Sequence, residues 1–265
     1  MDLEWKGQPT RVREMGTGAA VVLVHGYPLD GAMWSGVARS LSRQFRVLKP
    51  DLPGHGDAPG PAGRTMDEIA DFLEAVLQEI PPPVGLAAFS MGGYAALALA
   101  ARRPAALKAL ALIDTRASAD DEAGRAKRDE AIAMVRSGGV SAIADAMVPR
   151  LLDPASLHNE DLVERVRRII LRQKPETIEA DLAAMRDRPD RRSELPAIAL
   201  PTLVAVGDRD ALTPPSDSEA MAGAIPGARL VGIPAAGHLT PMERPGAVAR
   251  AISELFGEAL VVPRS

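Results

Sequence analysis

The stretch Val84–Arg103 constrains the fold of this chain more than any other part of its sequence. A short apolar run precedes Ser90, and the run that follows, Tyr94–Ala101, is apolar on every side. A strand and a helix without a polar face must each be covered on both sides, as in a parallel sheet with crossover helices. The sequence therefore predicts a buried strand and a buried helix that meet at Ser90.

Ser90 is the reactive side chain of this stretch. A sharp strand-to-helix turn strains the residue at its tip and presses its neighbours two places away against each other. Small residues are then needed at positions 88, 92 and 93, where the chain has Ala88, Gly92 and Gly93. Serine before an apolar helix is also a common helix cap, so the turn alone leaves a structural role for Ser90 open.

Strand-like and helix-like segments alternate along most of the chain, which predicts a mostly parallel, twisted sheet with helices on both faces. A capping box at Thr65 and Glu68 marks one helix start. The remaining tail, 260–265, is expected to be loose. Besides the strand and the helix that meet at Ser90, the expected strands are Ala19–Val24, Phe45–Leu48, Leu107–Ile113, Thr202–Val206 and Arg229–Ile233, and the expected helices are 32–43, 65–80, 216–224 and 245–256.

Residues 116–195 differ from the rest because they are much richer in charged side chains, with acidic and basic residues in near balance. We interpret them as a helical lid inserted into a core made of residues 1–115 and 196–265. Prolines 149, 154, 175 and 189 are expected to divide the lid into about four short helices. Its apolar faces are expected to help line a pocket, and they contain Leu162, Val166, Ile170, Ile178 and Leu182.

The overall composition excludes several function classes. A net charge of -4 offers no basic surface for nucleic acid or an anionic membrane, and the absence of cysteine removes disulfides, thiolate nucleophiles and Cys-ligated zinc. The first residues lack the pattern of a secretory signal, and no run approaches the ~18 apolar residues of a membrane span. We expect a cytoplasmic protein without a cofactor or a metal; the sequence leaves the oligomeric state unknown.

A serine hydroxyl needs a base to take its proton and a carboxylate to orient that base. The acidic candidates after predicted strands are Asp208, Asp210 and, less favoured, Asp114, and His238 follows the last strand. These positions lie where open α/β sheets carry their sites, at the carboxyl ends of the strands. His25 and His55, in tight glycine-flanked loops, are assigned structural hydrogen bonds to the backbone.

Five segments together resemble the α/β-hydrolase fold superfamily in its serine-nucleophile branch: A-x-S-x-G at Ser90, HGYPLDGAMW, DLPGHG, GDRDALTPP and AAGHLTPMERP. Ala88 replaces the glycine that usually begins this motif, which is called the nucleophile elbow. The resemblance implies Ser90 as nucleophile and His238 as base. Asp210 is the preferred acid because it lies four residues before Pro214, as in the family, whereas Asp208 directly after Gly207 suits the capping of backbone N–H groups in its own loop.

The same resemblance implies an oxyanion hole made of the Tyr27 and Met91 backbone N–H groups, with a cis Tyr27–Pro28 bond. It also implies a serine hydrolase that cleaves a small carboxylic ester or lactone through an acyl-enzyme. Transfer of the acyl group to peroxide or an alcohol, as in perhydrolases, and a ligand-binding receptor on the same fold remain alternatives. Enzymes of this fold with an aspartate nucleophile are disfavoured, because position 90 is serine.

Overall fold

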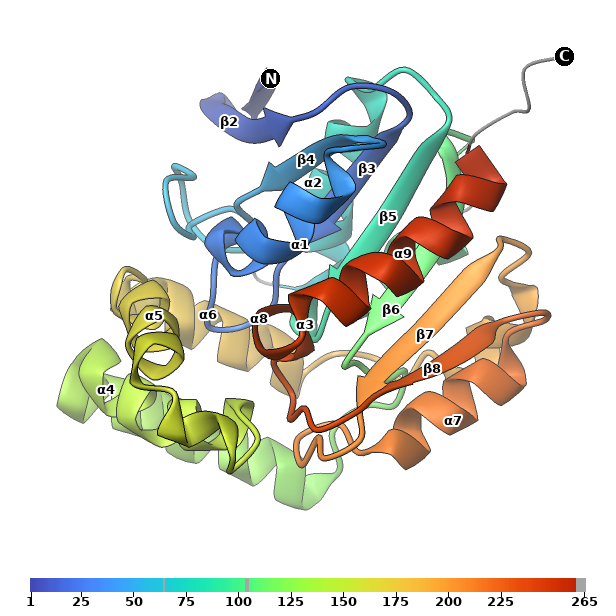
Figure 1. Ribbon diagram of the computed structural model, residues 1–265. Helices are drawn as coiled ribbons and strands as arrows, with labels where there is room; N and C mark the ends of the chain where they lie inside the picture. The colour runs from blue at the N-terminus through green and yellow to red at the C-terminus, as the bar shows by residue number, and fades with distance from the viewer. Residues whose placement is uncertain (64, 103–104, 261–265) are drawn as a thin grey trace, which may run out of the picture.

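The computed structural model describes residues 1–63, 65–102 and 105–260, which fold around one eight-stranded sheet (Figure 1). The strand order is β1-β2-β4-β3-β5-β6-β7-β8. Neighbouring strands from β4 to β8 run parallel, which confirms the mostly parallel sheet. The strands are β1 Asp2–Trp5, β2 Gln8–Met15, β3 Ala20–Val24, β4 Arg46–Pro50, β5 Val84–Phe89, β6 Leu107–Ile113, β7 Thr202–Gly207 and β8 Arg229–Ile233.

The N-terminal hairpin of β1 and β2 extends the sheet in the antiparallel sense, and the sequence did not predict it. Its strands lack an apolar run, because only Thr10 and Val12 of β2 are buried while charged residues occupy much of the rest. Pairing with β4, rather than local hydrophobicity, makes β2 a strand. The parallel strands, in contrast, are nearly continuous apolar segments that sequence reasoning locates within a few residues.

Helices cover both faces of the sheet (Figure 1). On one face α1 (Ser35–Leu41), which follows the short helix η1 (Gly31–Trp34), packs beside α9 (Pro245–Leu260). On the other face α2 (Met66–Gln78) packs against α3 (Met91–Ala101), and α7 (Pro215–Ala224) contacts β7 and β8. Thr65 caps α2 by accepting the Glu68 N–H at 3.1 Å, as the capping motif predicts. Of the residues expected to form a loose tail, Leu260 instead ends α9, and 261–265 lie outside the described residues.

Between β6 and β7 the chain forms a separate group of helices beyond the carboxyl ends of the strands, shown in green to gold in Figure 1. The group contains α4 (Glu122–Leu151), η2 (Ser156–His158), α5 (Glu160–Leu171), α6 (Pro175–Arg186) and η3 (Arg192–Ala197). The expectation that Pro149 divides helices is wrong. Pro149 lies inside the last turn of α4, which is instead interrupted at Gly139, where φ is 67°.

Helix α4 is also the one helix of the described ranges that has the length and hydropathy to cross a membrane, judged on those two properties alone. Two of its charged residues nevertheless pair with the neighbouring helices. Arg136 binds Glu179 of α6 at 2.7 Å, and Asp145 pairs with Arg167 of α5. These contacts join α4 to α5 and α6 as one layer over the sheet edge.

Candidate active site

Ser90 occupies the sharp turn between β5 and α3, with φ 49° and ψ -116°. The backbone there is crowded. A Cβ atom on Gly92 would lie 2.4 Å from the His25 carbonyl oxygen, and one on Gly93 would lie 2.4 Å from Thr115 Oγ1. Both contacts are too short for any side chain, which confirms that the turn needs the smallest residues at 92 and 93. Ala88 is fully buried in β5.

Three side chains from the ends of three strands form one hydrogen-bonded series. Ser90 Oγ lies 2.8 Å from His238 Nε2, and His238 Nδ1 lies 2.8 Å from Asp210 Oδ2. Ser90 follows β5, Asp210 follows β7 and His238 follows β8. All three side chains are buried, with at most 9% of their surface exposed. Imidazole placed between a hydroxyl and a carboxylate in this way can accept the hydroxyl proton while the carboxylate holds the ring.

The Asp210 carboxylate is held by its own loop. Oδ1 accepts hydrogen bonds from the N–H groups of Leu212 (2.8 Å) and Thr213 (3.0 Å), and Oδ2 accepts one from Thr213 Oγ1 at 2.7 Å. Burial alone would raise the pKa of Asp210, but the neighbouring His238 and these hydrogen bonds outweigh it and lower the pKa below its usual range. The carboxylate is therefore ionised at neutral pH.

Asp208 is in a different environment. It is exposed, and its Oδ1 accepts a hydrogen bond from the Ala236 N–H at 3.3 Å. The sequence suggested that Asp208 caps N–H groups of its own loop. Ala236 belongs to the loop after β8, so Asp208 instead caps a neighbouring loop. Asp114, the least favoured acidic candidate, is fully buried after β6 and hydrogen-bonds to Gly207 and Thr240.

The candidate oxyanion-hole residues are Met91, which directly follows Ser90, and Tyr27, which lines the same cavity as Ser90. The Tyr27–Pro28 bond is cis, as predicted. Met91 begins α3, so its N–H belongs to the first turn, where no helical carbonyl is available to accept it. The positive end of the α3 dipole also lies at this turn and favours negative charge there.

Two other histidines, His25 and His55, lie close together, with ring centroids 4.8 Å apart. His25 Nε2 accepts the Leu52 N–H at 2.9 Å, the structural bond expected from the sequence. Burial, followed by the neighbouring His55, lowers the pKa of His25 to about 4, so this ring is neutral.

The backbone role assigned to His55 is incomplete. Its Nδ1 is 3.2 Å from the Pro53 carbonyl oxygen, but its Nε2 lies 2.8 Å from Oδ2 of Asp181 in α6, and both side chains are buried. Burial acts to lower the pKa of His55, yet the charge of Asp181 and its hydrogen bond outweigh this and raise the pKa. Sequence reasoning missed the pair because its partners are 126 residues apart. Together with the Thr177 Oγ1 bond to the Gly54 carbonyl (2.9 Å), it attaches α6 to the core.

Asp181→Asn should destabilise the protein most at low pH. The pKa of His55 is raised by folding, so its contribution is complete below the usual value of 6.5 and is lost as pH rises through the raised value. We expect a loss of about 3 kcal/mol in the free energy of unfolding near pH ~5.5 and a smaller loss near pH ~9. Chemical unfolding at both pH values measures this.

Asp145→Asn is the matched control, because Asp145 pairs with Arg167 on the exposed surface. It should cost less than about 1 kcal/mol. A penalty for Asp181→Asn that is the same at both pH values would contradict the ionised His55–Asp181 pair.

A cavity of about 400 Å³ opens at Ser90. The core contributes Tyr27, Ser90, Leu212 and His238 to its wall, and the inserted helices contribute, among others, Met147 of α4 and Leu182 and Met185 of α6. Of the apolar residues named above as candidates for a pocket lining, only Leu182 lines it. The apolar face of α5 is buried elsewhere, since α5 packs against α4.

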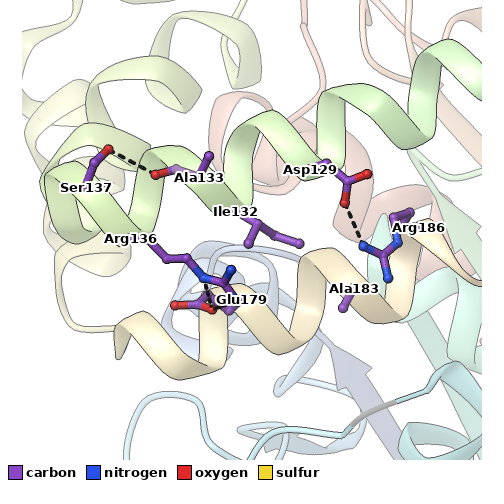
Figure 2. A pocket seen from close by; sticks show the side chains of 8 residues that line it. All are labelled: Asp129, Ile132, Ala133, Arg136, Ser137, Glu179, Ala183 and Arg186. Carbon is purple, nitrogen blue, oxygen red and sulfur yellow. Dashed lines mark hydrogen bonds and ion pairs between the residues drawn. The ribbon is translucent and has the colours of Figure 1, made fainter.

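A larger hollow of about 660 Å³ lies between α4 and α6, away from these residues (Figure 2). Figure 2 shows that its charged side chains bind one another across it: Arg136 with Glu179, and Arg186 with Asp129. We therefore place the candidate site at the smaller cavity, which contains Ser90 and His238. Within the described ranges, no group of three or more His, Cys, Asp or Glu side chains is arranged to hold a metal ion.

Comparisons with known proteins identify the family to which this fold belongs. The family model described as the alpha/beta hydrolase family matches residues 21–251. A thermophilic esterase from Thermogutta terrifontis, solved with malate bound, is 38% identical with a TM-score of 0.91 over 98% of this chain and 97% of that one. The enol-lactonase from Burkholderia xenovorans LB400 is 26% identical, with a TM-score of 0.89 over 97% and 100% of the two chains.

Among curated proteins, a pimeloyl-[acyl-carrier protein] methyl ester esterase from Nitrosomonas europaea is 28% identical over 237 residues, which are 86% of this chain and 91% of that protein. A protein of the same name from Chromobacterium violaceum is 29% identical over 92% of this chain and 96% of its own length. The chain therefore belongs to the alpha/beta hydrolase family, among its carboxylic ester hydrolases.

Proposed function

We propose that this ester hydrolase cleaves a small carboxylic ester or lactone through a covalent acyl-serine intermediate. Ser90 is the nucleophile, His238 the base and Asp210 the residue that orients it. The observation that carries the proposal is the series Asp210–His238–Ser90, whose two contacts are both 2.8 Å and which ends at a cavity of about 400 Å³. The esterase and lactonase relatives support the same class of substrate.

Acylation begins when Ser90 Oγ attacks the carbonyl carbon of the ester and His238 Nε2 accepts the hydroxyl proton. Asp210 stabilises the imidazolium through Nδ1. When the tetrahedral intermediate collapses, the bond to the leaving oxygen breaks and that oxygen takes the proton from His238. Water then repeats the sequence on the acyl-enzyme: His238 accepts its proton, and Ser90 recovers a proton as the acid leaves.

Negative charge develops on the carbonyl oxygen in both steps and needs donors aimed at it. We assign this role to the N–H groups of Tyr27 and Met91. The crowded turn at Ser90 supports the assignment, because it keeps the Met91 N–H beside the nucleophile.

We further propose that residues 116–195 act as a lid over a core of residues 1–115 and 196–265. The inserted helices supply one wall of the cavity at Ser90, and the buried His55–Asp181 pair attaches α6 to the core loop beside it. The lid would then select the acyl group by shape, while the chemistry stays with the core.

Met147→Trp should shorten the preferred acyl chain. Met147 lines the cavity from α4, so a larger side chain occupies volume that a longer acyl group needs. One or two methylenes are worth about 1–3 kcal/mol in such a pocket, so kcat/KM for a hexanoyl relative to an acetyl ester should fall about 10-fold or more. Steady-state kinetics on p-nitrophenyl esters of increasing chain length measure the ratio.

Leu171→Trp provides the control, because Leu171 is 45% exposed on α5 and does not line the cavity. It should leave the chain-length profile unchanged. If Met147→Trp also leaves the profile unchanged, α4 does not shape the acyl site.

The proposed function is tested by the same ester panel, extended to lactones and to methyl esters, which the names of the curated relatives suggest. Multiple turnovers with a burst of leaving group support an acyl-enzyme. Adding peroxide or an alcohol separates hydrolysis from acyl transfer, because both acceptors compete with water for one intermediate. Binding without turnover across the whole panel would refute hydrolysis and favour a receptor.

A further inference from the structure

One buried carboxyl behind the candidate triad has no role in the mechanism above. Asp114 directly follows β6 and has φ 47°, in the left-handed region that favours glycine, and its side chain is fully buried. Its own N–H donates to the Ala205 carbonyl of β7 at 2.9 Å. A non-glycine residue held in such a backbone, with a polar side chain out of water, costs stability unless its contacts offset it.

Those contacts join the two loops that carry Asp210 and His238. Asp114 Oδ1 accepts the Gly207 N–H at 2.9 Å, and Oδ2 hydrogen-bonds to Thr240 Oγ1. Gly207 lies three residues before Asp210, and Thr240 lies two residues after His238.

We propose that Asp114 is a positioning residue that holds the loop of Asp210 and the loop of His238 at the separation the catalytic series needs. This inference rests on the proposed function of Ser90, His238 and Asp210. The Asp114 side chain hydrogen-bonds to Gly207 and Thr240 and not to the reacting atoms themselves, so it acts through these two residues. A misplacement of about 1 Å in such a series can cost about 10²-fold in rate.

The surroundings of Asp114 favour its neutral form. Burial raises the pKa of this carboxyl well above its usual range, and the charge of Asp210 adds to the effect. A neutral carboxyl still accepts the Gly207 N–H and has a hydroxyl to share with Thr240. It also leaves the negative charge on Asp210, which binds the His238 ring.

Two substitutions separate the effect of the Asp114 hydrogen bonds from the effect of its charge. Asp114→Asn keeps an acceptor for Gly207 and a donor for Thr240 without any charge, so it should acylate within about threefold of the wild type, with the same acid limb in the pH profile of kcat/KM. Asp114→Ala removes both bonds and should lower kcat about 10- to 100-fold while KM changes little. Burst kinetics with p-nitrophenyl acetate measure both variants.

A second pair of variants keeps the inference testable if Asp114→Ala does not fold. Thr240→Val removes the hydroxyl that Asp114 binds and should lower the acylation rate about 10-fold, and Thr240→Ser should restore it. Thr202→Val is the matched control, since Thr202 is a buried threonine at the opposite end of β7 whose hydroxyl donates to the Leu200 carbonyl at 2.8 Å. It should change acylation less than threefold.

The outcomes distinguish the two levels of the argument. A wild-type protein that forms no acyl-enzyme overturns the proposed function, and this inference with it. If the wild type acylates, but Thr240→Val acylates no more slowly than Thr202→Val, the positioning role alone is overturned. The positioning role is also overturned if Asp114→Asn acylates as slowly as Asp114→Ala and the acid limb of its pH profile is shifted. The charge of Asp114, and not its hydrogen bonds to the two loops, would then be needed.

Discussion

Ser90→Ala should abolish turnover, with a loss of up to about 10⁶ in kcat, the size of the loss when a serine protease loses its nucleophile. The loss is this large because His238 then has no hydroxyl to activate, and only the surrounding N–H groups remain to stabilise charge. The fold should survive. Alanine is slightly smaller than serine, and the substitution removes the hydrogen bond between the Ser90 side chain and His238.

Covalent labelling identifies the nucleophile directly. A fluorophosphonate should attach to the peptide that contains Ser90 and to no other in the native protein. Ser35→Ala is a suitable control, because the Ser35 hydroxyl donates to the Ala32 carbonyl on an exposed turn. Label on Ser35, Ser40 or Ser216 with Ser90 unmodified would refute the assignment.

Asp210→Asn should lower the acylation rate by up to about 10⁴-fold without unfolding the protein. The amide preserves the shape of the loop and still accepts the N–H groups of Leu212 and Thr213. It cannot stabilise the imidazolium, and its NH₂ group favours the wrong tautomer of His238. Single-turnover acylation, followed beside thermal unfolding, separates the chemical effect from the structural one.

Asp208→Asn tests the other candidate with the same change two residues away. Asp208 is exposed and its carboxylate accepts one hydrogen bond, from the Ala236 N–H, which an amide oxygen also accepts, so acylation should change less than about threefold and stability less than about 1 kcal/mol. The assignment is wrong if Asp208→Asn abolishes acylation while Asp210→Asn behaves like the wild type.

Local sequence signals located most of the core elements. β6 and β8 have the bounds expected from their apolar runs, and α2 begins at the expected cap, Thr65. Such signals work because a buried strand or a capped helix depends on residues within a few positions of one another. The hairpin at residues 2–15 escaped them, since its strands depend on pairing with β4.

The inserted helices show where local rules compete. Pro149 and Gly139 both disfavour a continuous helix, and the interruption in α4 falls at Gly139. A proline in the last helical turn disturbs few hydrogen bonds, whereas a residue at positive φ departs from the helix altogether. The packing of α4 on α5 and α6 then keeps the two parts together.

The sequence by itself determined the α/β architecture, the turn at Ser90 and the strand ends at which the acidic and basic candidates lie, because each depends on periodicity and on small residues nearby. Only the tertiary structure decided which side chains meet. It places Asp210, and not Asp208, against His238. It also pairs His55 with Asp181 across 126 residues, and it brings Asp114 within hydrogen-bonding distance of Gly207 and Thr240. These contacts depend on how strands β6, β7 and β8 align and on where α6 docks, and such long-range packing leaves no local pattern in the chain.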